Sequence, residues 1–167
     1  GVAVLPNNVQ LLEVLGGAQI AAGEANQAIA TFTKLQVMAP TVPTPLMRLA
    51  GAHVAAKEFP AAIKALDRAI ELDSNNLDAI RQLAGAHLQS GSMEGALKQA
   101  RLLQAKRSNA PAGYLLEGDI YASQKKWNEA EQAYANGQKS IPAPAFVIRR
   151  VQTADAATAR HEQQVAH

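Results

Sequence analysis

Two histidines occupy the same place in two copies of the pentapeptide LAGAH, at residues 49–53 and 83–87. Imidazole nitrogens are common zinc ligands, so His53 and His87 are the first candidates for a chemical role. One zinc ion shared between them would require both rings to lie about 2.1 Å from the metal. The chain contains no cysteine, which excludes thiolate ligands and disulfides. The alternative to a metal site is that the histidines belong to an internal repeat.

The 34-residue step between the two histidines recurs along most of the chain. One column of this period holds Ala28, Ala62, Ala96 and Ala130, and the column four positions later holds Phe32, Leu66, Ala100 and Tyr134. Such a period is the sequence signature of a repeat architecture. Equivalent side chains on stacked helices lie about 8–10 Å apart, which is too far for one metal ion. We therefore predict a structural role for both histidines, and we predict no metal or other cofactor.

No other group of residues indicates catalysis. Glu117 and Asp119 are close in sequence, but side chains two positions apart on a helix point to different faces. No histidine stands in a fixed relation to a serine or threonine, and no glycine-rich loop follows a strand. The sequence therefore predicts a protein that is not an enzyme.

Apolar spacing within one period predicts two helices. In the second repeat the first stripe holds Leu46, Leu49, Ala50 and His53, and the second stripe holds Ala62, Leu66 and Ala69. Steps of three and four residues place side chains on one helix face. Between the stripes of successive repeats a short turn is expected at Gly23, Lys57, Gly91 and Lys125. Each repeat is thus an antiparallel helix pair, and the predicted fold class is all-α without strands.

The period also sets the predicted boundaries. Residues 1–8 are the tail of a preceding repeat, the four full repeats cover 9–42, 43–76, 77–110 and 111–144, and residues 145–167 form the first helix of a partial fifth repeat that acts as a cap. Helix pairs are expected near 9–39, 43–74, 77–108 and 111–140, and a further helix from about 145. In that last helix, Ile148 and Val151 fall in the phase of Leu46 and Leu49.

The repeated pattern resembles the tetratricopeptide repeat family. The first repeat meets the pattern at Leu12, Leu15, Gly16, Ala28, Phe32 and Pro40, and the fourth meets it at Tyr114, Gly118, Tyr121, Ala130, Tyr134 and Pro142. Glu117 departs from it, because the family has leucine there. The resemblance covers almost the whole chain. It implies a right-handed solenoid that acts as a non-enzymatic protein–protein interaction scaffold.

The resemblance also implies a binding groove along the first helices of the repeats. Its columns hold Gln10, Glu13, Gly17, Ile20 and Ala21, then Thr44, Met47, Gly51, Val54 and Ala55, then Asp78, Arg81, Gly85, Leu88 and Gln89, then Ala112, Leu115, Asp119, Ala122 and Ser123. The candidate groove residues are Met47, Gly51, Val54, Arg81, Gly85, Leu88, Leu115 and Asp119. Chaperone-binding relatives grip a carboxylate with an asparagine column, which here holds mostly glycine. An apolar peptide segment is therefore the expected partner, and an unoccupied spacer is the alternative.

A closer resemblance concerns the stretches PAGYLLEGDIYASQKKWNEAEQAY and IPAPAFVIRR. They look like the tetratricopeptide lipoproteins found with exosortase and PEP-CTERM sorting systems in bacteria that make exopolysaccharide. This resemblance implies a fragment of a longer, exported protein of the bacterial cell envelope. The chain itself has no lipid-accepting cysteine, so we expect any membrane anchor to lie outside it.

A second function follows from charge. The stretch KQARLLQAKR at 98–107 carries Lys98, Arg101, Lys106 and Arg107 without an acidic residue. It has no interleaved aromatic residue for base stacking, and the net charge of the whole chain is only +2, so no nucleic acid partner is expected. Binding of an anionic polymer such as an acidic polysaccharide, through this outer face, is the alternative to the peptide groove. Salt distinguishes the two, because polymer binding weakens steeply as salt rises.

Overall fold

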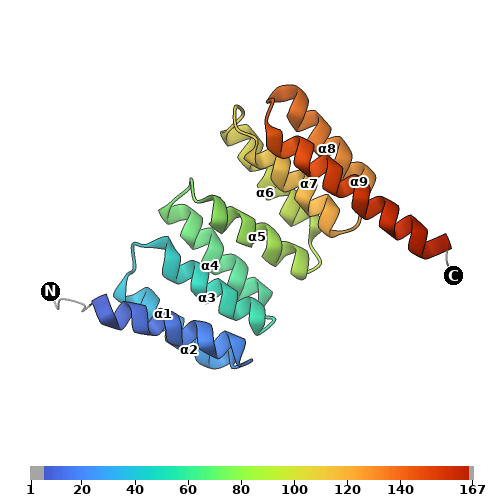
Figure 1. The fold of residues 1–167 in the computed structure, drawn as a ribbon. Coiled ribbons are helices and arrows are strands. Elements are labelled where there is room, and N and C mark those ends of the chain that lie inside the picture. Colours follow the sequence, from blue (N-terminus) through green and yellow to red (C-terminus); the bar gives the residue numbers. More distant parts are fainter. Residues whose placement is uncertain (1–5, 166–167) are drawn as a thin grey trace. The chain divides into compact units, whose positions relative to one another are not determined.

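The computed structural model describes residues 6–165, and within this range the chain is all-α, with nine helices and no strand (Figure 1). The helices are α1 (Pro6–Ala21), α2 (Ala25–Met38), α3 (Pro43–Ala55), α4 (Phe59–Leu72), α5 (Leu77–Gln89), α6 (Met93–Lys106), α7 (Ala112–Ser123), α8 (Trp127–Ser140) and α9 (Pro144–Val165). The predicted fold class is thereby confirmed. None of these described helices combines the length and apolar character that crossing a membrane requires.

The chain divides into two compact units, residues 1–92 and residues 93–167. The first unit contains α1 to α5, and the second contains α6 to α9. Within each unit, every helix packs against the next one in sequence. The boundary between the units falls in the turn inside the predicted third repeat, 77–110.

Most helix ends lie within two residues of their predicted places, and α1 is the exception. It begins at Pro6, three residues before the predicted start at residue 9, and residues 1–5 lie outside the described part. The predicted turns have left-handed backbone at Gly23, Lys57, Gly91 and Lys125. Asn76 caps α5, because its Oδ1 accepts a hydrogen bond from the Ala79 N–H at 3.0 Å.

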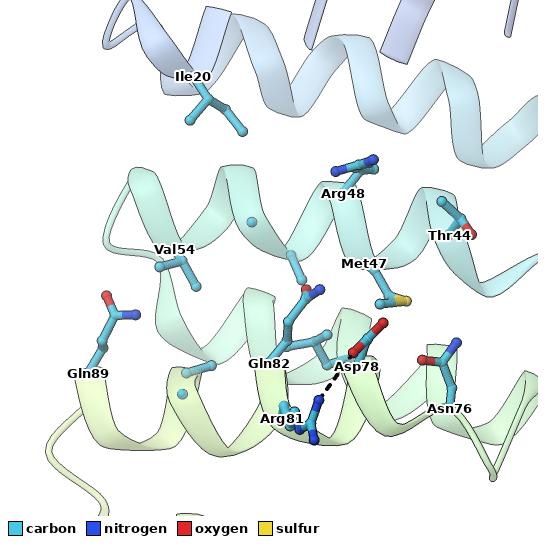
Figure 2. A pocket seen from close by; sticks show the side chains of 15 residues that line it. Ile20, Thr44, Met47, Arg48, Val54, Asn76, Asp78, Arg81, Gln82 and Gln89 are labelled. Atoms are coloured by element: carbon cyan, nitrogen blue, oxygen red, sulfur yellow. Dashed lines mark ion pairs between the residues drawn. The ribbon is translucent and has the colours of Figure 1, made fainter. Parts of the chain in front are cut away.

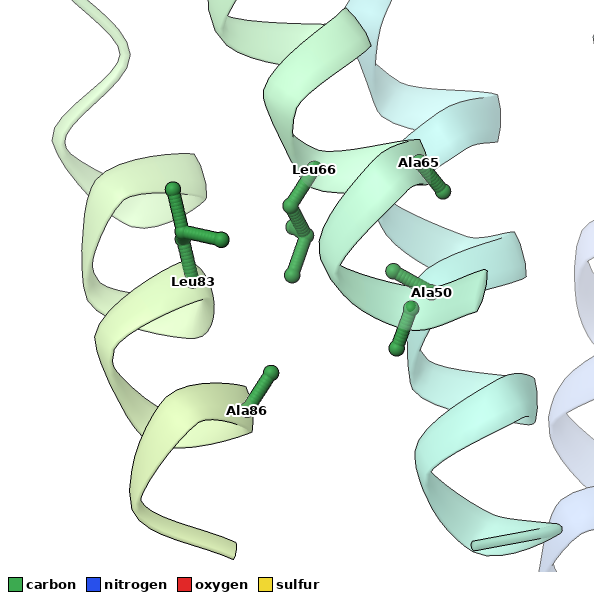
Figure 3. Packing of buried hydrophobic residues seen from close by; sticks show 6 residues of the cluster. Ala50, Ala65, Leu66, Leu83 and Ala86 are labelled. Carbon is green, nitrogen blue, oxygen red and sulfur yellow. The ribbon is translucent and has the colours of Figure 1, made fainter. Parts of the chain in front are cut away.

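The core of the first unit is built from leucine between small residues. Leu66 of α4 and Leu83 of α5 are buried together with Ala50, Ala65 and Ala86 (Figure 3). Alanine at the contact positions lets the helix backbones approach closely, and the leucines fill the remaining space. The alanine-rich composition of the chain is therefore a property of its helix contacts.

Residue sizes are matched between the two helices of a repeat. A Cβ atom added at Gly16 would lie 2.4 Å from the Phe32 ring, and one added at Gly118 would lie 2.1 Å from the Tyr134 ring. In the second repeat, where the large residue is Leu66, the small position holds Ala50 and both belong to one buried cluster. The large ring of the second helix thus requires glycine on the first.

Helix α9 packs in a different register from the one predicted. Phe146 and Thr153 are buried, whereas Ile148 and Val151 are exposed. Three residues separate α8 from α9, whereas four separate α4 from α5. The shorter connection moves every position of α9 by one residue, so Phe146 takes the place that Ala79 has in α5. The prediction that Ile148 and Val151 occupy the phase of Leu46 and Leu49 is therefore wrong.

Candidate functional site

An open groove of about 780 Å³ crosses the first unit (Figure 2). Its walls come from Ile20 of α1, from Thr44, Met47, Arg48, Gly51 and Val54 of α3, and from Asp78, Arg81, Gln82, Gly85 and Gln89 of α5. Asn76 stands at one end, and the core residues Ala50, Leu66 and Ala86 form the base. Successive first helices therefore do line one surface in this unit.

The predicted groove residues are distributed over both units. Met47, Gly51, Val54, Arg81 and Gly85 line the first-unit groove, and Leu88 is half-buried on α5 without lining it. Leu115 and Asp119 lie on α7 in the second unit. Leu115 packs there against the buried cluster of Ala130, Tyr134 and Phe146.

Glycine at two points widens the groove. A Cβ atom added at Gly51 or Gly85 would meet no heavy atom within 4 Å, in contrast to Gly16 and Gly118. Neither groove glycine is needed for packing within the chain. In a helix interior glycine costs roughly 0.5–1 kcal/mol relative to alanine. The fold alone therefore gives no reason for glycine at these two positions.

The groove lining combines apolar side chains with polar and charged ones. Met47 and Val54 supply the apolar surface, and the guanidinium groups of Arg48 and Arg81 flank it (Figure 2). Arg81 Nη1 lies 3.7 Å from Asp78 Oδ1, and both side chains are exposed. An exposed pair at this distance holds its partners weakly, so Arg81 is available to a ligand.

Sequence reasoning missed Arg48 and Gln82 as groove residues. Each follows directly after a residue of the predicted columns, Met47 or Arg81. The groove extends between neighbouring first helices, so side chains one position further around the helix also reach it. The available signal was that Arg48 and Gln82 are polar, whereas the other faces of their helices carry mostly small or apolar residues.

The contacts of the two LAGAH histidines fit a structural role. His53 Nδ1 lies 2.7 Å from Glu58 Oε2, and this hydrogen bond joins the end of α3 to the residue that precedes α4. His87 is half-buried near the end of α5. Among residues whose side chains are described, no three His, Cys, Asp or Glu side chains form a group that could hold a metal ion.

Titration with zinc is expected to show no stoichiometric site. One ring nitrogen of His53, Nδ1, is already hydrogen-bonded to Glu58. A stable zinc site also needs at least three protein ligands. Isothermal calorimetry of the whole chain measures this directly. A His53→Ala, His87→Ala double variant should melt at a lower temperature without any change in the zinc titration. Tight zinc binding that this double variant abolishes would contradict the structural role.

Asp119 is held in a hydrogen-bond network of the second unit. Tyr134 donates its hydroxyl proton to Asp119 Oδ1 at 2.7 Å, and Arg149 Nε lies 3.0 Å from the same oxygen. Burial, the hydrogen bond to Asp119 and the charge of Asp119 together raise the pKa of Tyr134 above its ordinary value. The Asp119 carboxylate thus binds one side chain from α8 and one side chain from α9. This network attaches α9 to the rest of the unit.

The neighbouring acid, Glu117, has a different partner. Its Oε2 accepts a hydrogen bond from the Gln104 amide at 2.7 Å, which joins α7 to α6. Asp119 instead borders a small cavity of about 220 Å³ together with Trp127, Tyr134, Arg149 and Thr153. The two acids therefore serve different helix contacts.

Comparison with known proteins agrees with this geometry. Residues 53–112 match the family model of the tetratricopeptide repeat. The chain has a tetratricopeptide repeat fold. No curated protein matched the chain. The tetratricopeptide repeat family is thus supported by the family model and by solved structures, whereas the closer resemblance to exosortase-associated lipoproteins stays a prediction.

Three solved structures illustrate the similarity of the tetratricopeptide repeat fold. A crystal structure of MamA is 27% identical over 81% of this chain and 79% of that one, with a TM-score of 0.59. The thermophilic protein TTC0263 of Thermus thermophilus is 21% identical over 89% of this chain and 80% of that one, with a TM-score of 0.63. The first TPR of Spaghetti (RPAP3), bound to the HSP90 peptide SRMEEVD, is 20% identical over 74% of this chain and 98% of that one, with a TM-score of 0.57.

Proposed function

We propose that the chain is a non-enzymatic interaction scaffold whose first-unit groove binds an extended segment of a partner protein. The observation that carries this proposal is the open space at Gly51 and Gly85. Glycine lowers helix stability and fills no packing role here, so its benefit lies in what approaches the groove. Without Cβ atoms, the two helices let a partner's backbone come close to their own. The first TPR of Spaghetti (RPAP3), which was solved bound to the HSP90 peptide SRMEEVD, supports the proposal that a peptide is the ligand.

The groove chemistry specifies the kind of segment. Apolar side chains of the ligand would pack on Met47 and Val54, which line the groove. The lining contains two arginines, Arg48 and Arg81, and one acid, Asp78, so its net charge is positive. An apolar segment with at least one acidic residue therefore fits better than a neutral or basic one. The Gly51 and Gly85 column provides no asparagine amide, so a free carboxyl terminus is not required.

The test replaces the open glycines by alanine. Gly51→Ala and Gly85→Ala should each raise the free energy of unfolding by about 0.5–1 kcal/mol, because alanine is the better helix residue. Each should also weaken capture of the groove ligand by about tenfold, because a methyl group then occupies the approach. Capture is measured by quantitative mass spectrometry of proteins retained from a bacterial envelope extract, and stability is measured by urea denaturation.

Gly17→Ala is the matched control. A Cβ atom at Gly17 also meets nothing within 4 Å, but Gly17 does not line the groove. This variant should gain the same stability and keep full capture. Equal capture by all three alanine variants would remove the support for a ligand in the groove.

The anionic-polymer alternative depends on the exposed side chains of Lys98 and Arg101 on α6. Replacing both by glutamate should leave peptide capture unchanged if the groove is the binding surface. Loss of capture with this double variant, together with a steep decrease as salt rises, would favour an acidic polysaccharide as the ligand.

The proposed setting is the bacterial cell envelope, with the chain as part of an exported lipoprotein linked to exosortase sorting and exopolysaccharide. Its support is the resemblance of residues 111–134 and 141–150 to such proteins. Fractionation of cells that express the full-length parent protein tests this. Recovery of the parent in the cytoplasmic fraction alone would contradict it, and the groove proposal would stand unchanged.

A further inference from the structure

The two open glycines lie partway along the walls of the first-unit groove. On α3, Gly51 follows Arg48 by three residues and precedes Val54 by three. On α5, Gly85 follows Arg81 by four residues. All five of these residues line the groove. Because residues three or four apart lie on the same helix face, each glycine divides its wall into two halves.

The two halves of the groove differ in chemistry. The charged residues of the lining all precede the glycines in their helices, and they are Arg48, Asp78 and Arg81. Figure 2 shows the other half at the opposite end of the groove, where the side chains are those of Ile20, Val54 and Gln89. None of the described lining residues in this second half carries a charge. The groove therefore has a charged half and an uncharged half, with the glycines between them.

The charged half has a cation to offer. Arg48 is exposed, and its guanidinium group forms no ion pair or hydrogen bond with any residue in the described part of the chain. Arg81 shares its charge with Asp78 across 3.7 Å. The excess positive charge is thus confined to one half of the groove, where it favours an acidic side chain of a ligand.

The equivalent path in the second unit is filled by side chains. Asp119 stands two periods after Gly51, and in the register of α9 described above Gln152 takes the place that Gly85 has in α5. Arg149 joins the two, since its Nε lies 3.0 Å from Asp119 Oδ1 and its Nη1 donates to Gln152 Oε1 at 3.1 Å. The cavity that these residues border is about 220 Å³, compared with about 780 Å³ in the first unit. The path over the glycines is open in the first unit and blocked in the second.

We propose, on the basis of the groove function proposed above, that the ligand is an extended segment in which acidic and apolar residues alternate. Its backbone crosses α3 and α5 over Gly51 and Gly85, where no Cβ atom stands in the way. Successive side chains of an extended chain point to opposite sides. One set therefore reaches Arg48 and Arg81, and the other set packs on Val54 in the uncharged half.

The same geometry disfavours a segment whose acidic residues form one block. In such a segment every second acidic side chain would point to the uncharged half. A carboxylate placed against Val54 would lose water without gaining a cationic partner, which is unfavourable. The order of the ligand residues therefore matters as much as their composition.

The experiment compares two blocked octapeptides of identical composition by isothermal titration calorimetry of the whole chain. Both contain three aspartates, three valines and a serine at each end. Aspartate and valine alternate in one peptide and form two blocks in the other. The alternating peptide should bind at least about tenfold more tightly than the block peptide, as expected when a central contact is lost.

The acidic side chains are tested by reversing charge in the groove wall. Arg48→Glu should weaken binding of the alternating peptide by about tenfold or more. Arg68→Glu is the matched control, because Arg68 is an exposed residue of α4 that does not line the groove and the change in net charge is the same. It should bind the peptide as wild type does. A third peptide with lysine in place of each aspartate should bind wild type more weakly, and Arg48→Glu should recover part of that loss.

Gly51→Ala separates this inference from the groove proposal on which it rests. If the alternating and block peptides bind equally and Gly51→Ala weakens both, alternation is wrong and the groove proposal stands. Equal effects of Arg48→Glu and Arg68→Glu would likewise overturn the inference alone. If no peptide binding is weakened by Gly51→Ala at up to about 1 mM peptide, the groove proposal and this inference fail together.

Discussion

Phe146→Ala is expected to lower the free energy of unfolding of the second unit by about 3–5 kcal/mol. The Phe146 side chain is fully buried, and its ring lies against Gly137 of α8 and the Tyr114 side chain of α7. Alanine would leave a cavity where three helices meet. Because Phe146 is the main apolar contact of α9, we also expect α9 to become accessible to protease before the rest of the unit.

The measurement is urea denaturation followed by circular dichroism at 222 nm, with limited proteolysis of the same variant. Val147→Ala is the matched control, since Val147 is the next residue and is half exposed. It should change stability by less than about 0.5 kcal/mol. An equal loss with both variants would mean that the register of α9 differs from the one described.

Leu83→Ala is expected to destabilise the first unit by about 2–5 kcal/mol. Leu83 is buried with Leu66 and Ala50, and these neighbours belong to helices that are already in close contact and have little room to collapse into a cavity (Figure 3). Denaturation by urea measures the loss. Leu11→Ala makes the same chemical change at an exposed residue of the same unit, so it should cost well under 1 kcal/mol. A loss below about half a kilocalorie for Leu83→Ala would show that this column is not a core column.

The helix pattern could be predicted because several local signals agree. The 34-residue period locates each pair, and the turn residues Gly23 and Gly91 have the left-handed backbone that glycine permits. Asn76 stands directly before α5, where asparagine is a favoured cap, and its side chain accepts a hydrogen bond from the Ala79 N–H. These features depend on neighbours in sequence, so the sequence contains the information needed to predict them.

The register of α9 could not be predicted from the period, because one missing residue in a connection shifts the whole helix. Phe146 was the available signal, as a single large aromatic residue after a proline-rich turn. Part of the groove was placed by the columns, including Met47, Gly51 and Arg81. The columns also separated the two kinds of glycine, since Gly16 and Gly118 belong to the family pattern and Gly51 and Gly85 belong to the groove columns. The close approach of the Phe32 ring to Gly16 and the open space at Gly51 depend on the atoms around each position.

The size matching of Gly16 with Phe32, Ala50 with Leu66 and Gly118 with Tyr134 limits how this chain can change during evolution. A larger residue on one helix is tolerated only after the facing residue on its partner has become smaller, so neither substitution is neutral without the other. Recombination that exchanges single helices between repeats would therefore combine a ring with a methyl group or leave a void beside a glycine. Duplication of complete helix pairs keeps these three matches intact, whereas matches that cross from one pair to the next, such as Phe146 against Gly137, must be restored separately.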